Sequence, residues 1–198
     1  MFEYRAAFAE PPEKGTSLPP VRITFPDGVH AMSTDERLDD ALSSSFEKPV
    51  KLIASPTGDM QFEGYIPDIE GLQHRNTVFT RTSPEGTFFD IGIVHLLTTS
   101  TIDALRKLSP ESRIETRRFR PNLVMNVPGA KGFIENEWVG RTLRLGEEVL
   151  LRIVQPTMRC VMTTLAQGDL PQDPNVLKTA VRHNDGAVGV YAEVLRSG

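Results

Sequence analysis

The stretch RTLRLGEEVLLRIVQPTMRCVMTT, residues 141–164, decides the fold class. Apolar and polar residues alternate on both sides of Leu-Gly-Glu-Glu, residues 145–148, and this pattern predicts two strands joined by a hairpin turn. The following segment, RCVMTT over residues 159–164, is predicted as a further strand. The sequence therefore predicts three strands in close succession.

Further short strands are predicted along the rest of the chain, separated by turn residues such as the Pro-Asp-Gly that follows VRITF. A Gly-, Pro- and Asp-rich stretch over residues 56–75 is predicted as a long loop. The predicted strands are VRITF (21–25), KPVKLIAS (48–55), RRFRPNLVMNV (117–127) and GAVGVYAEVLRSG (186–198).

Three short helices complete the prediction, over residues 35–46, 101–108 and 174–183. Ser33 or Thr34 is expected to cap the first helix, Ser100 the second, and Pro174 to open the third. Many short strands with three short helices favour a mainly β, α+β fold with a β-barrel-like core and helical caps.

The length of 198 residues suits one good-sized domain, with an extended, Pro-rich leader over residues 1–20 and the domain over 21–198. No apolar run is long enough to cross a bilayer. The single cysteine excludes an internal disulfide and a cysteine-built zinc or iron–sulfur site, and we expect a cytoplasmic protein without a membrane anchor.

Charge is distributed unevenly along the chain. The whole sequence carries a net charge of −4, whereas residues 106–159 hold 11 basic and 6 acidic residues, a net +5. The overall sign argues against a general nucleic-acid binder. The basic segment could hold a small anion, or its arginines could simply be solvated on strand edges.

Cys160 and the preceding Arg159 are the first candidates for chemistry. A guanidinium close to a thiol favours the thiolate, which is the nucleophile and the ligand for soft metals. The alternative is a buried cysteine that acts as a small hydrophobic side chain.

Asp90, Arg120 and Asn122 are further candidates. Asp90 lies inside an apolar stretch, where a carboxylate must be paired, hydrogen-bonded or at a strand end, and where it could accept a proton. Arg120 offers a planar fork for phosphate, and Asn122 both donates and accepts hydrogen bonds. Two residues apart on the predicted strand, these two side chains would share one face, either in a site or facing solvent.

The remaining residues of interest give weaker signals. His183 and Asn184 follow Cys160 in the order typical of papain-like thiol hydrolases, but neighbours on a helix point about 100° apart, so a helix end is the simpler interpretation. The other histidines, at positions 30, 74 and 95, show no metal-ligand spacing, and Trp138 is most simply a core residue.

Four blocks in order, RFRPNLVM, ENEWVGRTLRLGEEV, PTMRCVMTT and GVYAEVLRSG, resemble the MOSC domain (molybdenum cofactor sulfurase C-terminal domain). The stretch FDIGIVHLLTT resembles the segment before them. The resemblance covers residues 75–198 strongly and 20–55 more loosely. It implies a β-barrel-rich fold and a bound molybdenum–pyranopterin cofactor.

Members such as the mitochondrial amidoxime-reducing component suggest roles for the candidates. By resemblance, Cys160 would ligate molybdenum, Asp90 would lie near the metal and assist proton delivery, and Arg120, Asn122 and Arg159 would hold the cofactor. Ile91-Gly92-Ile93 departs from the small residues and proline of the family.

The implied reaction is the reduction of N-hydroxylated small molecules, with electrons from a separate donor protein. The alternatives are a non-catalytic carrier of the cofactor or of sulfur as a Cys160 persulfide, and a thiol hydrolase that uses Cys160 and His183.

Overall fold

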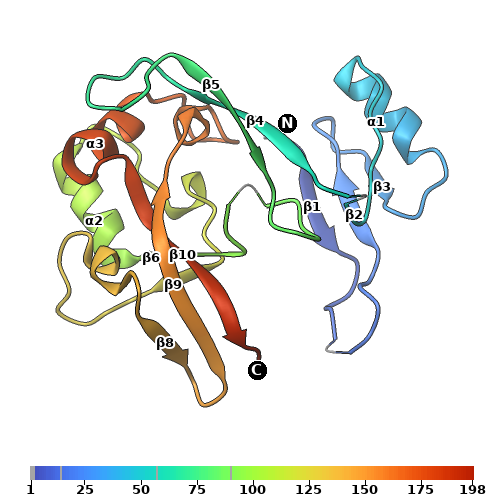
Figure 1. The fold of residues 1–198 in the computed structure, drawn as a ribbon. Helices are drawn as coiled ribbons and strands as arrows, with labels where there is room; N and C mark the ends of the chain where they lie inside the picture. Colours follow the sequence, from blue (N-terminus) through green and yellow to red (C-terminus); the bar gives the residue numbers. More distant parts are fainter. Residues whose placement is uncertain (1–2, 14, 57, 90) are drawn as a thin grey trace. The chain divides into compact units, whose positions relative to one another are not determined.

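The computed structural model describes residues 3–13, 15–56, 58–89 and 91–198 (Figure 1). The chain forms two compact units, Met1–Ser55 (unit 1) and Pro56–Gly198 (unit 2). Asp90 lies outside the described residues. No helix of the described residues is long and apolar enough to span a bilayer.

Unit 1 is a three-stranded antiparallel sheet with one helix, α1 (Leu38–Phe46). The apolar face of α1 packs on the sheet, and residues from both elements form a small core. The first strand lies inside the predicted leader, so part of that segment is paired with the sheet. The strands are β1 (Arg5–Phe8), β2 (Val21–Thr24) and β3 (His30–Met32), and the buried core residues are Ile23, Phe25, Leu38 and Leu42.

The strand predicted over residues 48–55 is absent from the structure, and this prediction was wrong. Side chains of α1 take the backbone groups that a sheet would need, because Ser43 Oγ accepts from Val50 N at 3.0 Å and Asp39 Oδ1 accepts from Leu52 N at 2.9 Å. Such local side-chain bonds compete with strand pairing.

The start of α1 also differs from the prediction. The helix begins at Leu38 rather than at residue 35, and neither Ser33 nor Thr34 caps it. The Ser33 hydroxyl instead accepts from Val21 N at 2.9 Å, which joins the turn to β2.

Unit 2 is built on a curled five-stranded sheet, which confirms the α+β fold and the barrel-like core. Its order is β7-β6-β10-β9-β8, and only the β6–β7 pair is parallel. The predicted hairpin is confirmed as β8 and β9, and the predicted C-terminal strand as β10. The strands are β6 (Val94–Thr98), β7 (Leu123–Met125), β8 (Thr142–Leu145), β9 (Val149–Met158) and β10 (Ala187–Arg196).

Short helices and a separate hairpin complete unit 2. Helices α2 (Thr99–Leu108) and α3 (Asn175–Asn184) lie together beside the sheet (Figure 1). The loop predicted over 56–75 instead contributes a strand to a hairpin. The hairpin strands are β4 (Gln61–Ile66) and β5 (Thr77–Thr82), and the 3-10 helices are η1 (Thr116–Arg118), η2 (Ile134–Trp138) and η3 (Val161–Thr164).

The sheet separates two apolar clusters. Leu97 of β6 joins α2 and α3 in one cluster, while its neighbour Leu96 enters the other, as strand alternation requires. In β10 the same switch occurs between Val188 and Val190, because a bulge at Gly189, with φ of +83°, shifts the register. Trp138 packs against the second cluster, in line with its predicted core role.

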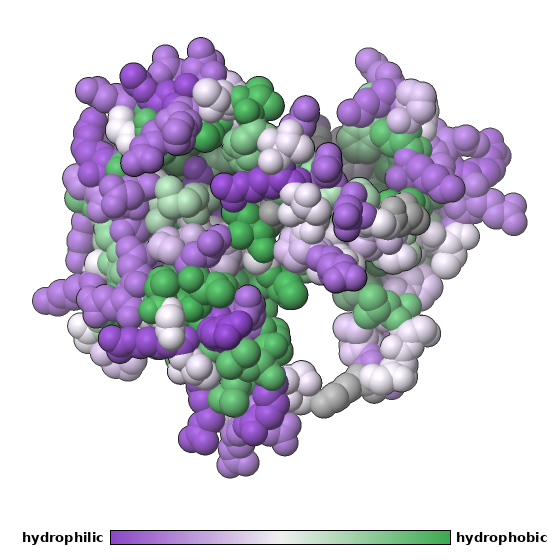
Figure 2. Space-filling model, in the orientation of Figure 1, coloured by the Kyte–Doolittle hydropathy of each residue, from purple (hydrophilic) through white to green (hydrophobic). Residues whose placement is uncertain are grey.

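Apolar side chains also lie on the outside of unit 2. Figure 2 shows them gathered over its lower part, where β9 and β10 run in Figure 1. Exposed apolar residues of these strands include Val154, Val194 and Leu195.

Three local predictions in unit 2 were wrong. The strand predicted over residues 117–127 is reduced to β7. The RCVMTT segment contains η3 instead of a strand, because the hydroxyls of Thr163 and Thr164 donate to the carbonyls of Cys160 and Val161. The cap of α2 is Thr98 rather than Ser100: its Oγ1 accepts from Thr101 N at 3.2 Å.

Candidate functional site

Cys160 stands where β9 ends and η3 begins. It is exposed, with extended backbone angles of φ −99° and ψ 179°. The interpretation of Cys160 as a buried hydrophobic residue is therefore wrong. An exposed thiol beside an arginine is accessible to a metal or a partner.

Arg159, directly before Cys160, is half-buried and points back into unit 2. Its NH2 group donates to the Phe119 carbonyl at 3.1 Å, and its guanidinium lies 5.9 Å from the centre of the Phe119 ring. Its backbone N–H donates to the Gly186 carbonyl at 2.8 Å. These contacts hold the start of the Cys160 loop against both Gly186, directly before β10, and the 119–122 segment.

Arg120 and Asn122 occupy that 119–122 segment, and both are exposed. They do not lie on a strand as predicted, since Arg120 has a left-handed φ of +51°. That conformation is strained for a residue with a side chain, and strain of this kind concentrates at functional sites. The Asn122 Oδ1 atom accepts from His95 N at 2.8 Å, which leaves its amide NH2 as the group to contact a ligand.

His95 joins these elements and was not predicted as a site residue. Its side chain is 5% exposed, and Nε2 donates to the Val188 carbonyl at 3.0 Å. Burial, and secondarily the charge of Arg159, lower the pKa of His95 to about 4, although hydrogen bonds to the backbones of Val188, Arg120 and Phe119 oppose this. His95 is thus neutral at pH 7.

The sequence offers one signal for His95, a polar residue within the apolar run IVHLL, residues 93–97. A buried polar side chain needs hydrogen-bond partners. Those partners come from strands and loops far away in the chain, so the pattern alone does not identify them.

Several of the basic residues counted over residues 106–159 are not available to an anion, because they are paired with carboxylates or buried. Arg113 and Arg117 pair with Glu115 and Asp169 at 2.5–3.0 Å. Arg118 is buried and donates to backbone carbonyls. Among the sequence-predicted candidates, Arg159 directly precedes Cys160, and Arg120 directly follows Phe119, whose carbonyl accepts from Arg159.

The thiol-hydrolase interpretation finds no support in the geometry. Within the described part of the chain, no hydrogen bond joins His183 to Cys160. The Asn184 side chain is hydrogen-bonded to other residues. Its Oδ1 accepts from Asn136 Nδ2 at 2.6 Å and its Nδ2 donates to the Ala187 carbonyl at 2.8 Å. Asn184 therefore fixes the end of α3, as the simpler interpretation proposed.

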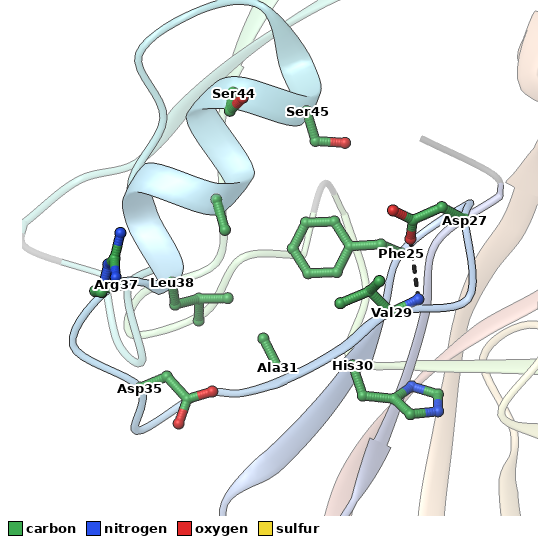
Figure 3. Close-up of a pocket in the computed structure, with 11 residues that line it drawn as sticks. Phe25, Asp27, Val29, His30, Ala31, Asp35, Arg37, Leu38, Ser44 and Ser45 are labelled. Carbon is green, nitrogen blue, oxygen red and sulfur yellow. Dashed lines mark hydrogen bonds between the residues drawn. The ribbon is translucent and has the colours of Figure 1, made fainter.

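A pocket of about 520 Å³ lies in unit 1, between α1 and the sheet (Figure 3). Its apolar wall includes Phe25, Val29 and Leu38, and Asp27 on its rim accepts from Val29 N at 2.9 Å. It contains none of the predicted site residues. No group of three or more potential metal-ligating side chains occurs among the described residues.

Comparison with known proteins agrees with the blocks that the sequence analysis singled out. A search of curated proteins found no match. The MOSC domain family model matches residues 87–198, which is more than half of the chain and includes Arg120, Asn122 and Cys160. The chain therefore belongs to the MOSC domain family.

Proposed function

We propose that this protein binds the molybdenum–pyranopterin cofactor, with Cys160 as the metal ligand, and reduces N-hydroxylated small molecules. MOSC domains are generally linked to this cofactor. The observation that carries the proposal is the exposed Cys160, held next to Arg159, whose guanidinium is anchored on the segment of Arg120 and Asn122.

The residues present fit such a group. A thiolate is the kind of soft ligand that binds molybdenum well. Arg120 is exposed and suits a phosphate, while the Asn122 amide suits the edge of a heterocycle. The left-handed strain at Arg120 is explained if the chain uses that turn to present the guanidinium.

The chain's own residues would bind and orient. When bound, the cofactor would supply a two-electron centre for removing oxygen from the N-hydroxyl group, with electrons from a separate donor protein. Arg159 would hold the start of the Cys160 loop in place through its bond to the Phe119 carbonyl. His95, neutral at pH 7, would fix the 119–122 turn without adding a second positive charge beside Arg159. Asp90 would assist proton delivery.

Metal analysis tests this proposal. The wild-type protein and Cys160→Ala are produced in a host that makes the cofactor, and bound molybdenum is measured per chain. His183→Ala serves as the control, because it removes an exposed polar residue outside the proposed site. We expect molybdenum in the wild type and in the control, and its loss in Cys160→Ala. Absence from the wild type, or equal content in Cys160→Ala, would overturn the proposal.

The exposure of Cys160 also favours a second candidate, a carrier that passes the cofactor or a persulfide sulfur to another protein. A thiol open to solvent can be reached by a partner protein. A reductase assay with amidoxime substrates and a supplied electron donor separates the two functions. Robust turnover that depends on Cys160 supports the reductase and rejects the carrier.

A further inference from the structure

Arg118 is the largest side chain in the buried interior of unit 2 and is only 1% exposed. Arg118 directly precedes Phe119, whose carbonyl accepts a hydrogen bond from Arg159. Burial lowers the pKa of Arg118, since removing a cation from water is costly. A guanidinium placed there must therefore have several well-directed hydrogen bonds.

Those bonds go to four backbone carbonyls. Nε donates to the Arg113 carbonyl at 2.9 Å within its own segment. The two terminal nitrogens reach a different part of the chain: NH1 donates to the carbonyls of Thr163 and Leu165 at 3.4 and 3.3 Å, and NH2 to that of Pro171 at 2.8 Å. Arg118 thereby joins both ends of the loop over residues 163–171.

This loop begins three residues after Cys160. The backbone N–H and the hydroxyl of Thr163 both donate to the Cys160 carbonyl, at 3.3 and 3.1 Å. Thr163 thus accepts from Arg118 and donates to Cys160. A continuous hydrogen-bonded path runs from the buried guanidinium to the backbone of the candidate metal ligand.

A second, exposed group of contacts holds the same loop from outside. Asp169, within the loop, accepts from Arg117 NH1 at 2.5 Å and from Arg113 NH2 at 3.0 Å. Glu115 accepts from both arginines at 2.6 and 2.8 Å. The 113–118 segment therefore contacts the loop in two layers, one buried and one exposed.

We propose that Arg118 is a positioning residue that fixes the loop over residues 163–171 and, through Thr163, the backbone of Cys160. A lysine cannot replace it, because a single ammonium lacks the planar fork that reaches three separate carbonyls. This inference rests on the proposed function for its relevance to metal binding, but its structural content can be tested without the cofactor.

Cys160 is the only cysteine of the chain, so a nitroxide spin label attaches there alone. The electron paramagnetic resonance line shape then reports how freely this position moves. We expect the label to tumble several-fold faster in Arg118→Lys than in the wild type. Amide hydrogen exchange over residues 160–171 should be about tenfold faster, the factor for losing one hydrogen bond to a charged group.

Two further variants make the test specific. Asp169→Asn weakens the exposed layer without disturbing a buried group and should also mobilise the label. Arg152→Met removes an exposed arginine of β9 that pairs with Glu193 of β10, and it should leave label mobility and amide exchange unchanged. The fluorescence of Trp138 confirms that each variant is folded.

The outcomes are distinct. Faster motion in Arg118→Lys with an unchanged control supports the proposal, and wild-type mobility in folded Arg118→Lys overturns it. If Arg118→Lys does not fold, Thr163→Val is used instead, because it removes the hydroxyl that donates to the Cys160 carbonyl. A more mobile label in folded Thr163→Val supports the proposed path, and wild-type mobility overturns it. Absence of molybdenum from the wild type would refute the proposed function and leave this test unaffected. In loaded protein, Arg118→Lys should hold several-fold less molybdenum than Arg152→Met.

Discussion

Lowering the pH should destabilise unit 2 through one buried residue, His95. The pKa of His95 is about 4 in the folded protein, whereas 6.5 is the ordinary value of a histidine, expected in the unfolded chain. As the pH falls, His95 therefore takes up a proton in the unfolded chain first. The contribution of the neutral His95 side chain to the free energy of unfolding is fully present above pH 6.5. It is lost between pH 6.5 and 4 and changes little below pH 4. This amounts to about 2 kcal/mol between pH 7 and 5 and about 3 kcal/mol by pH 4.

Urea unfolding followed by the fluorescence of Trp138 measures this effect, because that residue is the only tryptophan and packs in unit 2. At a typical slope of about 2 kcal/mol per molar urea, the wild-type midpoint should fall by about 1 M between pH 7 and 5. Carboxylates contribute to the same pH range, so His95→Gln is compared directly. It keeps a donor for the Val188 carbonyl but has no charge to acquire.

The difference between wild type and His95→Gln isolates the histidine. We expect the wild type to lose about 2 kcal/mol more than the variant between pH 7 and 5. His183→Gln, which removes an exposed histidine, should follow the wild type. Parallel pH profiles for wild type and His95→Gln would show that the His95 environment is not as described and would refute the reasoning.

Gly189→Ala should destabilise the protein by about 2–4 kcal/mol in urea unfolding, because the added Cβ would lie 2.5 Å from His95 Nε2 and from the Leu96 carbonyl at a φ of +83°. Leu97→Ala should cost about 2–5 kcal/mol in the same assay, since this side chain is 0% exposed and the variant leaves a cavity between the sheet and the helices. Arg120→Gly should instead raise stability by about 0.5–1 kcal/mol by relieving the left-handed strain, while molybdenum analysis should show a lower content. Equal or lower stability of Arg120→Gly would contradict the assignment of strain.

The elements predicted well are those with a long, regular pattern. The alternation over residues 141–156 and 186–198 appears as β8, β9 and β10, and the third predicted helix appears as α3, within one residue. Such patterns reflect burial on one face and depend little on distant contacts.

Two of the failures are segments where side chains bond locally to the backbone. Residues 48–55 look like a strand by composition, but Ser43 and Asp39 take their N–H groups. The RCVMTT segment contains β-branched threonines, yet Thr163 and Thr164 donate back to their own turn. The strand propensity of a threonine depends on the residue type and does not predict which acceptor its hydroxyl will bond to.

The candidate site was predictable as a set of residue types but not as an arrangement. Cys160, Arg120 and Asn122 stand out through the family resemblance. His95, which supports Asn122, depends on contacts with segments far away in the chain. A single histidine in an apolar run gives no indication that its backbone binds Asn122 and that its ring binds Val188.

The positive charge of residues 106–159 shows why counting charges does not locate an anion site. Arg113 and Arg117 form ion pairs with acidic neighbours, and the N–H groups of Arg118 donate to backbone carbonyls. Contacts of these three arginines join the 113–118 segment to the loop over residues 163–171, whereas Arg120 and Arg159 are the arginines proposed to hold the cofactor. Asp169→Asn should therefore increase the mobility of this loop. In protein that binds the proposed cofactor, a changed salt dependence of binding would report the separate effect of the lost negative charge.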